Sequence, residues 1–193
     1  MNAIELQPLA DAETDLLQVL STALQDTFHV PVLVRTDSLP LAQFYDSQRG
    51  QYNSTDILHF IDASRRSSPY TDNPHPPKKV SVVAITGMDL FMPILTYVFG
   101  EAVLGGDVAV VSYHRFRNEL YGLPSNRRLL LERLCKVVIH ELGHTLGLVH
   151  CSFQHCVMHA ASYVEELDLK SASFCSVCYK MVNHPIHSQT RSE

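Results

Sequence analysis

The sequence predicts an α/β or α+β fold, in which a twisted, mixed sheet of four or five strands carries two or three helices. Short β-branched runs alternate with amphipathic segments through the first half of the chain. A longer amphipathic segment, with apolar residues every three or four positions, follows the last of these runs. Cysteine and histidine accumulate beyond it, which indicates a small C-terminal subdomain.

Five short apolar runs predict the strands. They are residues 3–6, 30–35, 80–86, 96–102 and 108–113. The run over 80–86 is dense in β-branched residues, as is typical of a buried central strand. Pro31 places the second run at a sheet edge or at a strand beginning, because proline cannot donate a ladder hydrogen bond.

Helical periodicity is found in four segments. They are residues 12–27, the residues after 54, residues 126–146 and residues 162–172. The first three begin after a short polar side chain that can accept hydrogen bonds from free N–H groups, so we expect Asp11, Ser54 and Ser125 to be N-caps. Gly147 is expected to end the third helix.

Two segments predict connections without regular structure. Residues 39–53 form a long polar connection, and residues 67–79 contain four prolines. The second is the best candidate for a flexible segment. The length of 193 residues suits one domain, which we expect over residues 1–181 with a subdomain at about 148–181 and a polar tail over 182–193.

Composition excludes several classes of protein. Hydrophobic residues make up 46% of the chain and charged residues 18%, which is typical of a globular protein. The formal net charge of −5 argues against a general nucleic-acid binder, which needs a basic field. Acidic residues interrupt the apolar stretch at 80–111 and the N-terminal segment, so we expect no membrane span, no signal peptide and a cytoplasmic location.

One string of residues carries chemistry. His140 and His144 are four residues apart on a predicted helix, so both imidazoles lie on one face and can reach one zinc ion. Glu141 is offset by one residue. It therefore sits beside the metal, where it can act as the general base that takes a proton from an activated water.

The string continues to a third candidate ligand. Gly147 can adopt a left-handed conformation without penalty and reverse the chain, so that His150 returns to the metal. Three histidine ligands leave a fourth position open, which is typical of a catalytic zinc site and not of a structural one. Two histidines at helical spacing are often a coincidence, but five residues at these fixed offsets are not.

Four of the five cysteines lie in the last quarter of the chain. They are Cys151, Cys156, Cys175 and Cys178. The last two have the spacing of a zinc knuckle, and four thiolates can bind one zinc ion in a closed structural site. Unbound thiols and a disulfide pair are the alternatives, although a reducing compartment disfavours a disulfide.

The string His-Glu-x-x-His-x-x-Gly-x-x-His is the metzincin signature, and the residues around it resemble one family of that clan. With the four cysteines and Met158, residues 137–180 are similar to the archaemetzincins. This resemblance implies a metzincin-like fold and a zinc metallopeptidase with two zinc ions per chain, one catalytic and one bound by the cysteines. It also implies that Met158 lies in the turn beneath the catalytic zinc, as a packing residue.

Other histidines and the fifth cysteine are weaker candidates. His155 is a rival ligand for the cysteine zinc, and His159 is a candidate for the cleft, although a surface position suits both. Cys135 lies within the predicted helix and is best interpreted as a small buried hydrophobe. His184 and His187 belong to the polar tail.

The expected reaction is hydrolysis of a peptide bond, with a peptide or protein as substrate. By order along the chain, residues 96–102 are the strand expected to pair with an extended substrate. Two alternatives stay open. One is a zinc-binding interaction protein with little or no turnover, against which the intact Glu141 argues. The other is hydrolysis of a non-peptide amide, since the same activated water attacks any carbonyl that it reaches.

Overall fold

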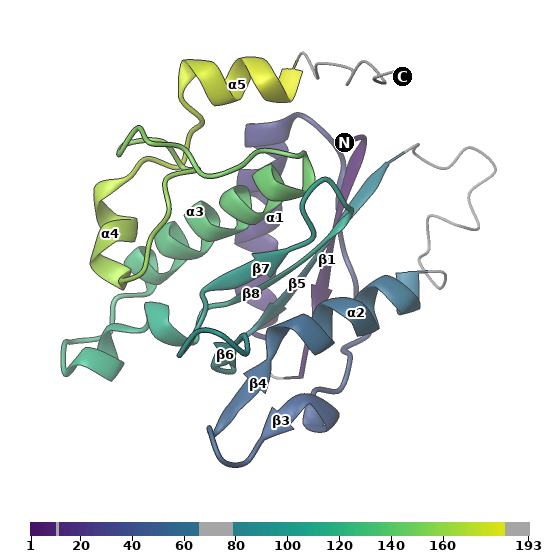
Figure 1. The fold of residues 1–193 in the computed structure, drawn as a ribbon, viewed down its shortest axis with the longest axis vertical. Helices are drawn as coiled ribbons and strands as arrows, with labels where there is room; N and C mark the ends of the chain where they lie inside the picture. The colour runs from purple at the N-terminus through teal and green to yellow at the C-terminus, as the bar shows by residue number, and fades with distance from the viewer. Residues whose placement is uncertain (11, 66–78, 184–193) are drawn as a thin grey trace, which may run out of the picture.

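The computed structural model describes residues 1–10, 12–65 and 79–183, and a five-stranded sheet forms its centre (Figure 1). The strand order is β2-β1-β5-β8-β7. The strands are β1 (Ala3–Pro8), β2 (Val32–Val34), β5 (Val80–Thr86), β7 (Gly100–Ala102) and β8 (Val108–Ser112). Four of them are parallel to their neighbours, whereas β7 pairs antiparallel with β8 at an edge. The predicted mixed sheet is confirmed, with residues 80–86 as its central strand.

Alternating side chains of the central strands build two separate cores. Val83 and Ala109 face helices α1 (Thr14–Phe28) and α3 (Arg127–Thr145), whereas Val82 faces α2 on the opposite side. Figure 1 shows α2 on one side of the sheet and α1 and α3 on the other. Both faces are buried, which explains why the central strands are continuous apolar runs.

The N-caps of two helices lie one residue away from the predicted serines. The side-chain oxygen of Asn53 accepts from the N–H groups of Thr55 and Asp56 at 3.1 and 3.4 Å and begins α2 (Ser54–Ser64). Asn126 caps α3 in the same way. Ser54 instead donates to the carbonyl oxygen of Phe91. Asparagine and serine are comparable caps, so the sequence alone does not rank them.

Helix α1 has Glu13 at the N-cap position, without a side-chain hydrogen bond. The predicted cap, Asp11, lies outside the described residues. So does the predicted flexible segment, except for Lys79.

The connection expected over residues 39–53 has regular structure, so that prediction was wrong. It contains the 3-10 turn η1 (Ala42–Phe44) and the short strands β3 (Tyr45–Asp46) and β4 (Gln51–Asn53). With β6 (Leu90–Phe91) they form a small sheet in the order β3-β4-β6. Two further 3-10 turns, η3 (His114–Phe116) and η4 (Asn118–Tyr121), precede α3.

The strand that was expected to pair with a substrate and the last helices differ from their predicted bounds. Strand β7 begins only at Gly100, because residue 98 instead forms an isolated bridge to β6. Helix α4 (Val164–Leu169) is shorter than the predicted 162–172, and α5 (Ser176–Asn183) was not predicted. The predicted tail thus begins inside α5, and its residues 184–193 lie outside the described part of the chain.

Within the described ranges, no helix combines the length and the apolar character needed to cross a membrane.

Candidate active site

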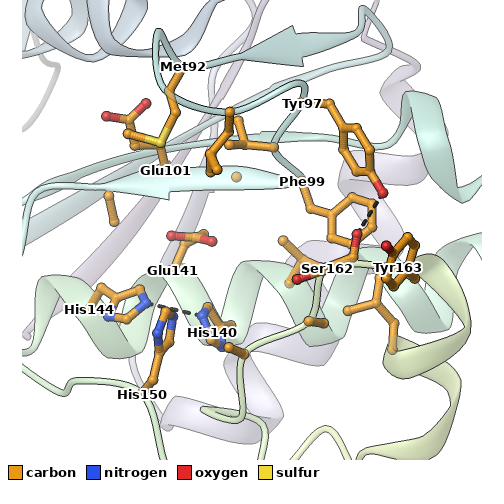
Figure 2. Close-up of a pocket in the computed structure, with 18 of the residues that line it drawn as sticks. Met92, Tyr97, Phe99, Glu101, His140, Glu141, His144, His150, Ser162 and Tyr163 are labelled. Carbon is orange, nitrogen blue, oxygen red and sulfur yellow. Dashed lines mark hydrogen bonds between the residues drawn. The ribbon is translucent and has the colours of Figure 1, made fainter.

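The three histidines of the motif meet at one point beside the cleft (Figure 2). His140 and His144 project from one face of α3, and Gly147, at a φ of +89°, turns the chain so that His150 returns to them. Their donor atoms all lie within 4.8 Å of one another. The Nε2 atoms of His140 and His144 are 3.1 Å apart.

Backbone carbonyl groups fix the orientation of two of the rings. Nδ1 of His140 lies 2.8 Å from the carbonyl oxygen of Val157, and Nδ1 of His144 lies 2.8 Å from that of Leu148. A carbonyl oxygen only accepts, so each Nδ1 carries the proton and donates it. Both Nε2 atoms therefore present lone pairs to each other, an arrangement that needs a cation between them.

A proton is disfavoured as that cation. Burial lowers the pKa of His140 to about 3, and the positive charge of Lys170 lowers it further. Burial also lowers the pKa of His150, with the charge of His144 as the next cause. At neutral pH these rings are neutral imidazoles, the form that binds a metal ion.

Glu141 lies between α3 and β7. Figure 2 shows its carboxyl group pointing from the helix toward the strand that carries Glu101. Its side chain is nearly inaccessible, with 6% of the residue exposed, and burial raises its pKa to about 8; the charge of Glu101 raises it further, while that of Lys170 opposes the shift. The close fit requires Gly100, because a Cβ there would lie 2.8 Å from both Cγ and Oε1 of Glu141.

A cleft of about 720 Å³ runs along β7 and over the histidines. All residues from 96 to 102 line it, so the segment predicted to face a substrate lies along the cleft even where it is not a strand. At one end Tyr97 donates a hydrogen bond of 2.6 Å across the cleft to the carbonyl oxygen of Ser162 (Figure 2). The cleft therefore has one wall from the sheet and one from the C-terminal subdomain.

Met158 is fully buried against α3. Its sulfur occupies the space that a Cβ at Gly143 would need, so the two chain segments approach closely only because residue 143 is glycine. The carbonyl oxygen of Met158 accepts from the N–H group of Cys151 at 2.9 Å. Met158 thus lies in a turn packed under the active-site helix.

The four predicted cysteines also converge, and their sulfur atoms all lie within 4.8 Å of one another. The sulfurs of Cys151 and Cys175 are 3.8 Å apart, and Cys156 accepts from the N–H group of Cys175 at 3.3 Å. The backbone N–H group of Cys178 lowers the pKa of Cys175 to about 7, which favours its thiolate. All four are free thiols in this structure.

The rival residues lie outside both clusters. Nδ1 of exposed His155 lies 3.3 Å from the carbonyl oxygen of Leu169, and Nδ1 of His159 lies 2.9 Å from that of Cys151. Cys135 is half-buried and packs against the core, and the loss of solvent raises its pKa to about 11, which disfavours the reactive thiolate. His184 and His187 lie outside the described residues.

Sequence reasoning missed Lys170. Its residue is only 4% exposed, and its ammonium group donates to the carbonyl oxygens of Val157 and His159 at 3.0 and 2.9 Å. Burial lowers its pKa to about 8, so it remains largely protonated at neutral pH. A lone lysine beyond a short helix has no motif, and only its tertiary position distinguishes it.

Comparison with known proteins agrees with this geometry. The model of peptidase family M54 matches residues 13–184. The archaemetzincin of Methanocaldococcus jannaschii is 35% identical over 175 residues, which cover 91% of this chain and 89% of that protein. The archaemetzincin of Archaeoglobus fulgidus is 35% identical over 181 residues, which cover 94% and 99%.

Solved structures show the same fold. A zinc-dependent peptidase from Methanocorpusculum labreanum has a TM-score of 0.85 at 30% identity, covering 93% of this chain and 100% of that chain. The archaemetzincin of Archaeoglobus fulgidus, complexed with malonate, has a TM-score of 0.75 at 34% identity, covering 92% and 98%. The predictions of the fold and of a zinc metallopeptidase are confirmed, and an interaction protein without turnover is not favoured. The chain belongs to peptidase family M54, the archaemetzincins.

Proposed function

We propose that His140, His144 and His150 hold the catalytic zinc ion of this peptidase. The observation that carries the proposal is the pair of Nε2 lone pairs that face each other at 3.1 Å while both Nδ1 atoms donate to carbonyl groups. Zn–N bonds of about 2.0–2.1 Å in a tetrahedral site place two ligand nitrogens about 3.3–3.4 Å apart. The observed separation is within a few tenths of an ångström of that spacing.

Glu141 is the proposed general base. When bound, the zinc ion lowers the pKa of water and polarises the carbonyl group of the substrate. Glu141 would accept the proton of the attacking water and pass it to the leaving amine nitrogen. Its burial supports this role, because a carboxylate shielded from bulk water is a stronger base than an exposed one.

An extended peptide is the proposed substrate, aligned along β7. One side of this strand pairs with β8, and the other side borders the cleft. An edge strand presents free N–H and C=O groups that can pair with an added strand. The peptide would then lie between β7 and the three histidines, with its scissile carbonyl near Glu141.

A second zinc ion, held by the four cysteines, is the proposed structural site. Zn–S bonds of about 2.3 Å in a tetrahedral site separate the sulfurs by about 3.8 Å. That spacing matches the 3.8 Å between Cys151 and Cys175. This ion would join the segment after His150 to the beginning of α5. We also propose a cytoplasmic location, where thiols stay reduced and free to bind metal; cell fractionation tests it.

Zinc content per chain tests the two sites. We expect two zinc ions in the wild type and one in each of His144→Ala and Cys175→Ala. One ion in the wild type, lost only in His144→Ala, would refute the cysteine site. One ion lost only in Cys175→Ala would refute the histidine site.

Peptide hydrolysis tests the base. We expect Glu141→Gln to keep both zinc ions and to lose activity by at least about 100-fold, the lower end of the general base contribution. Full activity with zinc bound would show that another group takes the proton.

A further inference from the structure

Lys170 places a buried positive charge at the wall of the cleft. The residue follows α4, is 4% exposed and lines the cleft together with Val137 and Leu167. Its ammonium group shares the carbonyl oxygen of Val157 with the ring of His140, at 3.0 and 2.8 Å. The charge therefore lies next to the proposed catalytic centre.

Among the residues that the structure describes, no carboxylate lies within ion-pair distance of Lys170, although the charge of Glu141 acts on it from farther away. The ion pairs found there do not include Lys170. Its two hydrogen bonds are to neutral carbonyl oxygens, which supply dipoles but no counter-charge. An ammonium group has three N–H donors, so one remains for a further partner. A buried charge is costly unless it is paired, which points to an anion that arrives with the ligand.

The surroundings of Lys170 suit a short aliphatic chain that ends in a carboxylate. Phe99, Val137 and Leu167 are among the residues that give the cleft apolar walls, and the hydrogen bond from Tyr97 to Ser162 crosses it. Methylene groups can pack against such walls. A carboxylate beyond them would form a charge-assisted hydrogen bond in a medium of low dielectric constant.

We propose that Lys170 makes this peptidase select peptides that place a carboxylate next to the scissile bond. The carboxylate comes either from an acidic side chain or from the C-terminus of the peptide. The inference rests on the proposed function, because the histidines and Glu141 define where the scissile bond lies. The rival explanation is structural: Lys170 could compensate the charges of Glu141 and of the thiolates, since Glu141 and then Cys156 are the negative groups that act on it most.

Binding to a variant without turnover separates these explanations. The zinc-loaded Glu141→Gln protein is titrated calorimetrically with short peptides that carry Glu or Gln at each position in turn, all with C-terminal amides. A third series carries Gln and a free C-terminal carboxylate. We expect one acidic peptide to bind about 10-fold or more tightly than its neutral match, as hydrogen bonds to charged groups allow. The series that shows the preference identifies the source of the carboxylate.

Lysine variants in the same background locate the effect. Lys170→Met should reduce the ratio of acidic to neutral affinity to about one, whereas Lys170→Arg should retain a preference. Lys136→Met is the matched control, because Lys136, like Lys170, donates to a backbone carbonyl group, in this case that of Leu167, but does not line the cleft. It should keep the full preference.

Two results would overturn the inference. One is equal affinity for acidic and neutral peptides in the Glu141→Gln protein itself. This measurement does not depend on whether a Lys170 variant folds. The other is an undiminished preference in Lys170→Met. Hydrolysis by the protein with Glu141 intact is measured on the same peptides. Preference without hydrolysis would contradict only the proposed function, and hydrolysis without preference would contradict only the role of Lys170.

Discussion

Gly100→Ala is expected to displace the proposed base without touching a metal ligand. The added Cβ would lie 2.8 Å from Cγ and Oε1 of Glu141 and 2.9 Å from the carbonyl oxygen of Val110. Val110 belongs to β8, the strand to which β7 is paired. The methyl group cannot move toward β8 without disturbing that pairing, so Glu141 must yield.

The size of the effect follows from these contacts. Non-bonded carbon atoms normally approach to about 3.5–4.0 Å, so the carboxyl group must move by about 0.7–1.2 Å. A misplacement of about 1 Å at a catalytic group can cost about 100-fold in rate. We therefore expect kcat to fall about 100-fold, equivalent to about 2.7 kcal/mol in activation free energy. Zinc content should stay at the wild-type value, because the three atoms nearest to the new methyl group belong to Glu141 and Val110 and not to a histidine.

The assay is steady-state hydrolysis of a peptide with zinc content measured on the same sample. Gly122→Ala is the control, because Gly122 has a φ of +72° and no atom within 4 Å of an added Cβ. It introduces backbone strain of about 1 kcal/mol away from Glu141. If Gly100→Ala kept kcat within about threefold of the wild type, Glu141 would not be the base or would not be held by this contact.

Three further predictions follow from single contacts. Gly143→Ala should force Met158 out of its position, lower stability by about 1–3 kcal/mol and weaken zinc binding at the histidines, as measured by competition with a chelator; unchanged zinc affinity would contradict it. Without metal, the wild type should lose about 1.4 kcal/mol of unfolding free energy per pH unit relative to Glu141→Gln between pH 4.5 and 8, because the buried carboxyl group, with its pKa raised to about 8, keeps a proton that the unfolded chain has released. Denaturant titrations across that range check the slope, and parallel curves would refute it. Tyr97→Phe should raise KM by about 3–10-fold, more than it changes kcat, by removing the bond to Ser162; an equal fall in kcat and kcat/KM would argue against it.

The convergence of the proposed metal ligands was predictable because it depends on local backbone geometry. Residues four apart lie on the same face of any α-helix, as His140 and His144 do. A glycine after such a helix predicts a turn, and Gly147 forms the one that brings His150 back to them. The structure brings these donor atoms together as expected. The sulfur cluster was predictable for a different reason, since the thiols of a Cys-x-x-Cys knuckle need only a second pair to complete a tetrahedral site.

The rest of the cleft was not predictable because it depends on contacts between distant segments. The sequence does not distinguish Gly100 from other strand glycines, because its contact with Glu141 exists only once α3 packs against β7. Lys170 resembles a solvated lysine until the turn at Val157 buries its ammonium group. Strand β7 is short because its preceding residues bond to β6, a strand of two residues that no periodicity identifies.

The turn at residues 156–159 connects the two proposed metal sites. Cys156 belongs to the sulfur cluster, the carbonyl oxygen of Val157 orients the ring of His140, and Met158 packs under α3. Any shift of the sulfur cluster would therefore move the acceptor that fixes the tautomer of a proposed catalytic ligand. Lys170 bonds to the same carbonyl oxygen, so the proposed substrate charge, structural metal and catalytic metal would all act on one peptide group. A structural zinc at the cysteines would in this way limit the motion of the catalytic centre.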